Sequence, residues 1–79
     1  PDNASITDSL GWAQFKRGRV EQAIATLQHA ATKDPSQSEI HEHLGDALYT
    51  AGRKFEARHA WSAALITAED GVRSRIQAK

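Results

Sequence analysis

The sequence contains no cysteine and no methionine, and it has only two prolines. Without cysteine, disulfide bonds and thiolate metal sites are excluded. No apolar run approaches the roughly 20 residues that a helix needs to cross a bilayer. Ten basic residues balance ten acidic residues, so the chain lacks the basic excess of general nucleic-acid binders. We therefore expect no disulfide, no membrane-spanning segment and no nucleic-acid partner.

The most informative feature that is present is an internal period of 34 residues. When the sequence is shifted by 34 positions, identical residues coincide at Pro1/Pro35, Ile6/Ile40, Leu10/Leu44, Gly11/Gly45, Ala13/Ala47, Gly18/Gly52, Arg19/Arg53, Ala23/Ala57 and Ala30/Ala64. Most of these residues are small, apolar or turn-forming. Such a period is typical of stacked helix–turn–helix units. The pattern predicts one domain over residues 1–79, with a first repeat over about 2–35 and a second over about 36–69.

Apolar residues at helical spacing predict two helices in each repeat. The expected helices cover about residues 3–17, 20–33, 36–51 and 54–68. Glycine ends helices readily and proline excludes the helical conformation of the residue before it, so the breaks are expected at Gly18, Asp34-Pro35 and Gly52. The fold class that follows is all-α.

Two further features concern the ends of these helices. The segment from Ser36 to Glu39 fits a capping box and is expected to open the third helix. The tail, residues 70–79, matches nothing one period earlier, but Val72 and Ile76 have helical spacing. Because terminal repeats otherwise expose apolar surface, we expect this tail to form a short capping helix.

The residues at fixed positions of each unit resemble the tetratricopeptide repeat, whose pattern is W-x2-L-G-x2-Y, then A-x3-F, then P. The pattern is matched by Leu10-Gly11, Ala23, Leu27 and Pro35 in the first unit, and by Leu44-Gly45, Ala57 and Trp61 in the second. The chain departs from it at Thr7 and His41 for tryptophan, Gln14 and Leu48 for tyrosine, and Glu69 for proline. The resemblance implies two stacked repeats in which the glycines lie where the helices of a unit approach closest.

The repeats also resemble the C-terminal repeats of long bacterial tetratricopeptide proteins. This resemblance implies a location in the bacterial envelope, either periplasmic or associated with the outer membrane, with the cytoplasm as the alternative. Pro1 aligns with Pro35, which ends the first repeat. We therefore expect the chain to be part of a longer array of repeats.

In this family the first helix of each repeat lines a concave groove that binds peptides. The groove residues implied here are Asp8, Trp12, Phe15, Glu39, Glu42, Asp46 and Tyr49, together with Ser5, Lys16 and Thr50. They predict an acidic, aromatic surface, with Asp46 facing solvent, that recognises a protein or peptide segment carrying basic and apolar residues. The alternative for Trp12 and Phe15 is that both pack against an upstream repeat.

Two other roles compete with groove binding. The repeats could serve only to terminate and stabilise a longer solenoid. Alternatively, one edge of the stack could contact an acidic partner, lipid head groups or RNA through the basic residues at the turns, which are Lys16, Arg17, Arg19, Arg53, Lys54 and Arg58. The opposite edge carries the acidic residues Asp2, Asp34, Glu69 and Asp70. The favoured explanation of the basic residues is the stabilising effect of cations at helix C-termini.

The sequence does not predict catalysis or a bound metal or cofactor. His41 and His43 are two residues apart and diverge by about 200° on a helix, whereas a zinc-binding helix places its ligands four apart. Glu39 and His43 have that spacing, but two ligands do not complete a site. No serine, histidine and acid are arranged as a nucleophile with its base, so we expect no enzymatic activity.

Overall fold

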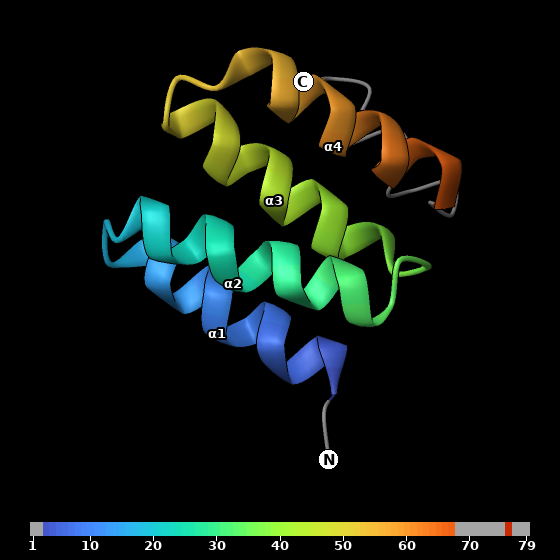
Figure 1. The fold of residues 1–79 in the computed structure, drawn as a ribbon, viewed down its shortest axis with the longest axis horizontal. Helices are drawn as coiled ribbons and strands as arrows, with labels where there is room; N and C mark the ends of the chain where they lie inside the picture. The colour runs from blue at the N-terminus through green and yellow to red at the C-terminus, as the bar shows by residue number, and fades with distance from the viewer. Residues whose placement is uncertain (1–2, 68–75, 77–79) are drawn as a thin grey trace.

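The computed structural model describes residues 3–67 and Ile76. These residues form the helices α1 (Ala4–Lys16), α2 (Val20–Lys33), α3 (Ser38–Thr50) and α4 (Lys54–Thr67), as Figure 1 shows. The helices predicted for the two repeats are therefore confirmed. The predicted capping helix over residues 70–79 lies outside the described residues, except for Ile76, which is helical and buried.

The four helices form two antiparallel pairs that stack side by side. α1 packs on α2 and α3 packs on α4, while α2 and α3 join the two pairs. In Figure 1 the α1–α2 turn and the α3–α4 turn lie on the same side, at the left, and the α2–α3 turn lies at the right. The stack therefore has one edge that carries both turns within the units.

The same turn ends the first helix of each unit. Gly18 and Gly52 have φ angles of 81° and 83°, in the left-handed region that favours glycine. After each glycine, a backbone N–H reaches back to the preceding helix. Arg19 donates to the carbonyl of Gln14 and Arg53 donates to that of Leu48, each at 2.9 Å. These bonds satisfy carbonyl groups that a helix end otherwise leaves without partners.

The predicted capping box at the start of α3 is wrong. Gln37 is the N-cap residue, and its side chain makes no capping hydrogen bond. The Ser36 hydroxyl instead donates to the carboxylate of Asp34, which also accepts from the Ser36 N–H and the Gln37 amide. These bonds, with that of the Ser36 hydroxyl foremost, lower the pKa of Asp34. A nearby carboxylate is a stronger acceptor than a hydroxyl, so Asp34 organises this turn.

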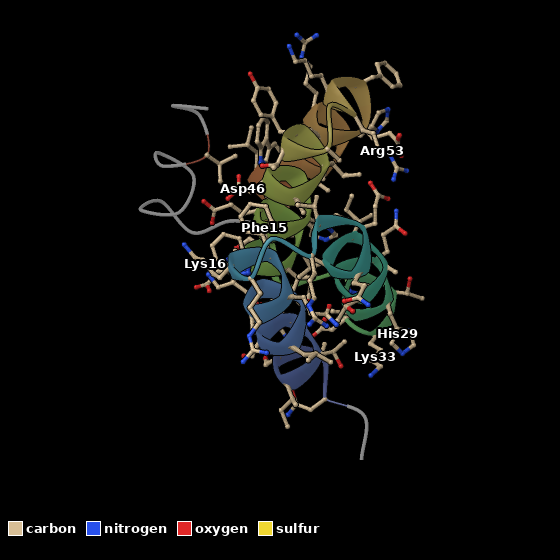
Figure 2. All side chains as sticks on the ribbon, turned by 90° about the vertical axis from the view of Figure 1, so that its left-hand side faces the viewer. Phe15, Lys16, His29, Lys33, Asp46 and Arg53 are labelled. Carbon is tan, nitrogen blue, oxygen red and sulfur yellow. The ribbon has the colours of Figure 1, made fainter. Side chains whose placement is uncertain are left out.

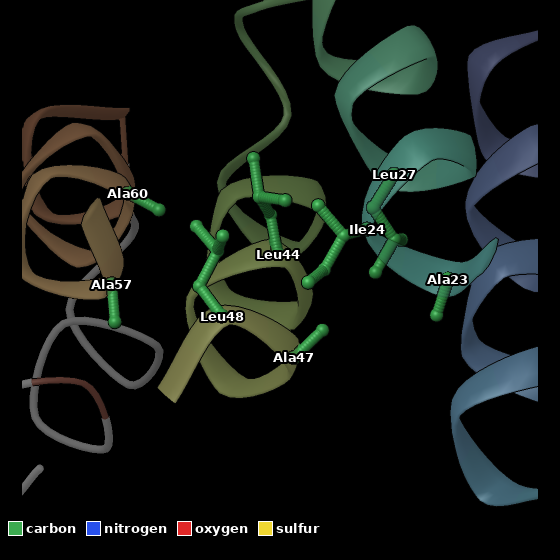
Figure 3. Packing of buried hydrophobic residues seen from close by; sticks show 8 residues of the cluster. All are labelled: Ala23, Ile24, Leu27, Leu44, Ala47, Leu48, Ala57 and Ala60. Carbon is green, nitrogen blue, oxygen red and sulfur yellow. The ribbon is translucent and has the colours of Figure 1, made fainter. Parts of the chain in front are cut away.

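The core lies between α2, α3 and α4. Its buried residues are Ala23, Ile24, Leu27, Leu44, Ala47, Leu48, Ala57 and Ala60. Figure 3 shows α3 in the middle of this cluster, with Ile24 pointing toward it from α2. A smaller cluster joins Ala4, Ala30 and Ile40 across α1, α2 and α3. The alanines allow close approach of the helices, and the branched residues fill the remaining space.

Gly11 and Gly45 lie beneath large side chains of the second helices. A Cβ atom at Gly11 would come within 2.7 Å of Leu27 Cγ, and one at Gly45 within 2.3 Å of Trp61 Cδ1. Leu27 and Trp61 are themselves 34 residues apart, so one packing arrangement recurs in both units. The expectation that these glycines mark the closest helix approaches agrees with this geometry.

Candidate partner-binding groove

The predicted groove residues all lie on α1 and α3, but their surroundings differ. Asp8 and Glu42 are buried, whereas Glu39 and Tyr49 are exposed. Trp12, Phe15 and Asp46 have intermediate exposure. The surface available to a partner is therefore smaller and less acidic than the sequence suggested.

The buried Asp8 joins the two units. Its Oδ1 atom is hydrogen-bonded to Nδ1 of His43 at 2.8 Å, so the bond links α1 to α3. The Ser5 hydroxyl makes a second link between the units, because it donates to Oε1 of Gln37 at 3.0 Å. His43 was considered only as a metal ligand in the sequence. The sequence contains no signal for this role, because the 34-residue period makes Asp8 equivalent to Glu42 and does not relate it to His43.

His43 is also one end of a stack of rings. The Trp12 ring lies 4.1 Å from the His43 ring and 5.0 Å from the Phe15 ring, both nearly parallel. The Lys16 ammonium lies 5.0 Å from the Trp12 ring centre, and Figure 2 shows Phe15 and Lys16 near one another. Phe15 also packs against the core cluster. Trp12 therefore contacts the second unit through His43, and Phe15 contacts Trp12 and the core; whether an upstream repeat also packs against them stays a prediction.

Asp46 and Tyr49 both contact the indole of Trp61, which comes from α4. Trp61 Nε1–H donates to Asp46 Oδ1 at 3.2 Å. The prediction that Asp46 simply faces solvent is therefore wrong. The Tyr49 ring lies 5.6 Å from the Trp61 ring, and Lys54 lies over the Tyr49 ring at 5.6 Å. Tyr49 is half exposed, so part of its ring remains accessible.

A polar hollow of about 530 Å³ lies beside the first halves of α1 and α3. It is lined by Ser5, Asp8, Ser9, Ser36, Gln37, Ser38, Glu39 and Thr67. Hydroxyl and carboxyl groups dominate this lining, which suits a polar or cationic group better than an apolar one. Of these residues, Ser5, Asp8 and Glu39 were expected in the groove. Of the others, Ser9 lies on α1 and Ser38 begins α3. Ser36 and Gln37 come from the α2–α3 turn and Thr67 comes from α4, neither of which the family pattern associates with the groove.

The two stacked pairs, with Leu27 above Gly11 and Trp61 above Gly45, repeat one unit of structure with a period of 34 residues. The family model of the tetratricopeptide repeat matches residues 9–72. This chain belongs to the tetratricopeptide repeat family. Searches among curated proteins and among solved structures find no match.

Tetratricopeptide repeats are generally non-catalytic modules that mediate protein–protein interaction. In the part of this tetratricopeptide chain that the structure describes, no three His, Cys, Asp or Glu side chains gather into a possible metal site. Within residues 3–67 and Ile76, no helix combines the length and apolarity needed to cross a membrane. The candidate groove on the described residues thus combines a polar hollow with an aromatic region on α1 and α3.

Proposed function

We propose that this chain is a protein-interaction module whose α1–α3 face binds a segment with basic and apolar residues. The half-exposed ring of Tyr49 carries this proposal, because it remains accessible beside the ordered Trp61. Large aromatic side chains in such positions supply much of the binding energy at protein interfaces. Exposed Glu39, at the rim of the polar hollow, supports the preference for a basic group.

The positions of Glu39 and Tyr49 suggest the spacing within the bound segment. They lie ten positions apart on α3, which corresponds to about 15 Å along the helix axis. An extended peptide covers this distance in roughly four or five residues. The preferred ligand therefore carries a lysine or arginine about four or five positions from a large apolar residue.

Fluorescently labelled peptides with this spacing test the proposal by anisotropy. Tyr49→Ala is expected to weaken binding by about tenfold, the effect of losing an important interface aromatic. Glu39→Lys should reverse the preference from basic to acidic peptides. Phe55→Ala is the matched control, because Phe55 is an exposed aromatic on α4, outside the proposed site. Peptides that bind wild type and both groove variants equally would rule out this face.

A second candidate role, as one part of a longer array, is favoured by the outer face of α1. Ile6 and Leu10 are 68% and 55% exposed, although Ile40 and Leu44, one period later, are buried beside α2. The same face of α3 is thus covered by the second helix of the preceding unit. We propose that a further repeat covers Ile6 and Leu10 in the same way.

Fusing a designed repeat ahead of residue 1 tests whether a further repeat packs on this face of α1. The thermal midpoint of the chain should rise, since each stacked neighbour adds an interface. Leu10→Glu should abolish the gain while leaving the unfused chain nearly unchanged. An equal gain with wild type and Leu10→Glu would show that this face does not receive a repeat.

A further inference from the structure

The edge that carries both turns within the units is strongly basic. We define this turn edge as residues 16–22 and 50–56, and Figure 2 looks onto it. Its basic residues are Lys16, Arg17, Arg19, Arg53 and Lys54, and its acidic residues are Glu21 and Glu56. Lys16 and Arg53 lie on opposite sides of the view in Figure 2, so the basic groups are spread over the edge.

Both acidic residues of the turn edge are directed to one cation. Glu56 accepts two hydrogen bonds from the Arg53 guanidinium, at 2.8 and 2.7 Å, and Glu21 lies 3.8 Å from it. Within the described part of the chain, neither carboxylate forms an ion pair with the exposed cations Arg17, Arg19 and Lys54. The edge therefore keeps a clear positive excess, although the whole chain has zero formal charge.

Helix dipoles explain only part of this distribution. Lys16 lies in the last turn of α1 and Arg17 follows it, where cations are favourable. Arg19, however, is the N-cap residue of α2, and Lys54 is the first residue of α4. Cations at helix N-termini are disfavoured by the dipole. The favoured sequence interpretation thus does not account for Arg19 and Lys54.

A large aromatic residue projects from the same edge. Phe55 is 74% exposed and directly follows Lys54. Its ring contacts that of His59 edge-on at 5.3 Å, and this contact leaves most of the ring accessible. Exposed aromatic residues flanked by cations are typical of surfaces that rest in the headgroup region of a membrane.

We propose that the turn edge is a contact surface for an anionic phospholipid bilayer. The cations would lie at the level of the lipid phosphates, and the ring of Phe55 would enter the interface. A bilayer fits these observations better than an acidic protein segment, because the two turns project to one side and Phe55 protrudes instead of lining a hollow. This contact is independent of the proposed peptide groove on α1 and α3.

Co-sedimentation of the chain with lipid vesicles tests this proposal. We expect binding to vesicles that mix phosphatidylserine with phosphatidylcholine, and little binding to phosphatidylcholine alone. Arg19→Ala should lower the partition coefficient about fivefold, the contribution of one cation near an anionic surface. Lys33→Ala removes the same charge at the other end of α2 and should change the partition coefficient much less.

Phe55→Ala tests the aromatic contribution, with Ile66→Ala as its control. Ile66 is also exposed on α4, but it lies at the end distant from the turn edge. Phe55→Ala should reduce vesicle binding by about tenfold, whereas Ile66→Ala should leave it unchanged. Circular dichroism should establish equal helicity of all four variants before binding is compared.

Three outcomes would overturn the proposal. The first is equal binding to anionic and neutral vesicles. The second is an equal loss of vesicle binding in each variant and in its control. The third is an absence of vesicle binding at about 0.1 M salt, with or without binding to acidic peptides. Binding to acidic peptides alone would assign the turn edge to a protein partner.

Discussion

Gly45→Leu is expected to destabilise this chain severely. The Cβ atom alone would lie 2.3 Å from two atoms of the Trp61 ring, so the indole must move before the rest of the leucine is accommodated. Its movement would also break the hydrogen bond to Asp46. Overpacking a well-packed core typically costs about 1–3 kcal/mol and occasionally more. The measurement is the free energy of unfolding from urea titration followed by circular dichroism.

Thr50→Leu provides the matched control for Gly45→Leu. Thr50 is exposed on the same helix, and its hydroxyl donates to the Asp46 carbonyl one turn earlier in α3. Adding leucine there should change stability by less than about 0.5 kcal/mol. Asp46→Ala is a poor control, because Asp46 holds the Trp61 indole. Similar unfolding midpoints for Gly45→Leu and Thr50→Leu would contradict the close approach of α3 and α4.

Leu27→Ala is expected to have the second large effect. Leu27 has no exposed surface and packs both above Gly11 and within the core cluster. Removing a buried leucine side chain leaves a cavity and typically costs about 2–5 kcal/mol. A chain of this size has a total stability of roughly 4–12 kcal/mol. The substitution should therefore remove much of the free energy of unfolding, measured in the same titration.

Leu10→Ala gives a comparison with the same chemical change in the same unit. Leu10 is more than half exposed, so the lost side chain was already largely in contact with water. We expect a loss well below that of Leu27→Ala, because hydrophobic stabilisation scales with the area removed from water. Equal losses for the two variants would be incompatible with the described burial of Leu27 and exposure of Leu10.

The fold could be predicted because its determinants are local and periodic. Gly18 and Gly52 end helices through their own backbone conformation, whatever surrounds them. Gly11 and Gly45 indicate where two helices approach closely, because a side chain at either position would have no space. The start of α3 was harder to predict, since Asp34 and Ser36 offer competing hydrogen bonds. The Ser36 hydroxyl and N–H donate to the Asp34 carboxylate. The relative strength of these acceptors, and not the presence of a capping pattern, therefore decides which hydrogen bonds form at the start of α3.

The candidate site was less predictable, because periodicity identifies a helix face but not the partner of each side chain. Asp8 was expected to face a ligand, yet it contacts His43 of the next unit. Asp46 was expected to face solvent, yet it accepts the indole N–H of Trp61. Both contacts depend on the relative placement of units or helices, to which a single sequence offers few clues. The exposed position of Tyr49 agrees with the groove expectation, and its role there stays a prediction.

The order of the helices in space has a consequence for how the chain folds. Among the described helices, α1 and α4 do not contact one another, and each helix packs mainly on its neighbour in the sequence. Among the described residues, the contacts between successive helices close short loops, for which the entropic cost is small. Proteins dominated by such local contacts fold within microseconds to milliseconds. We therefore expect that either helix pair can serve as a folding nucleus, as is general for repeat proteins.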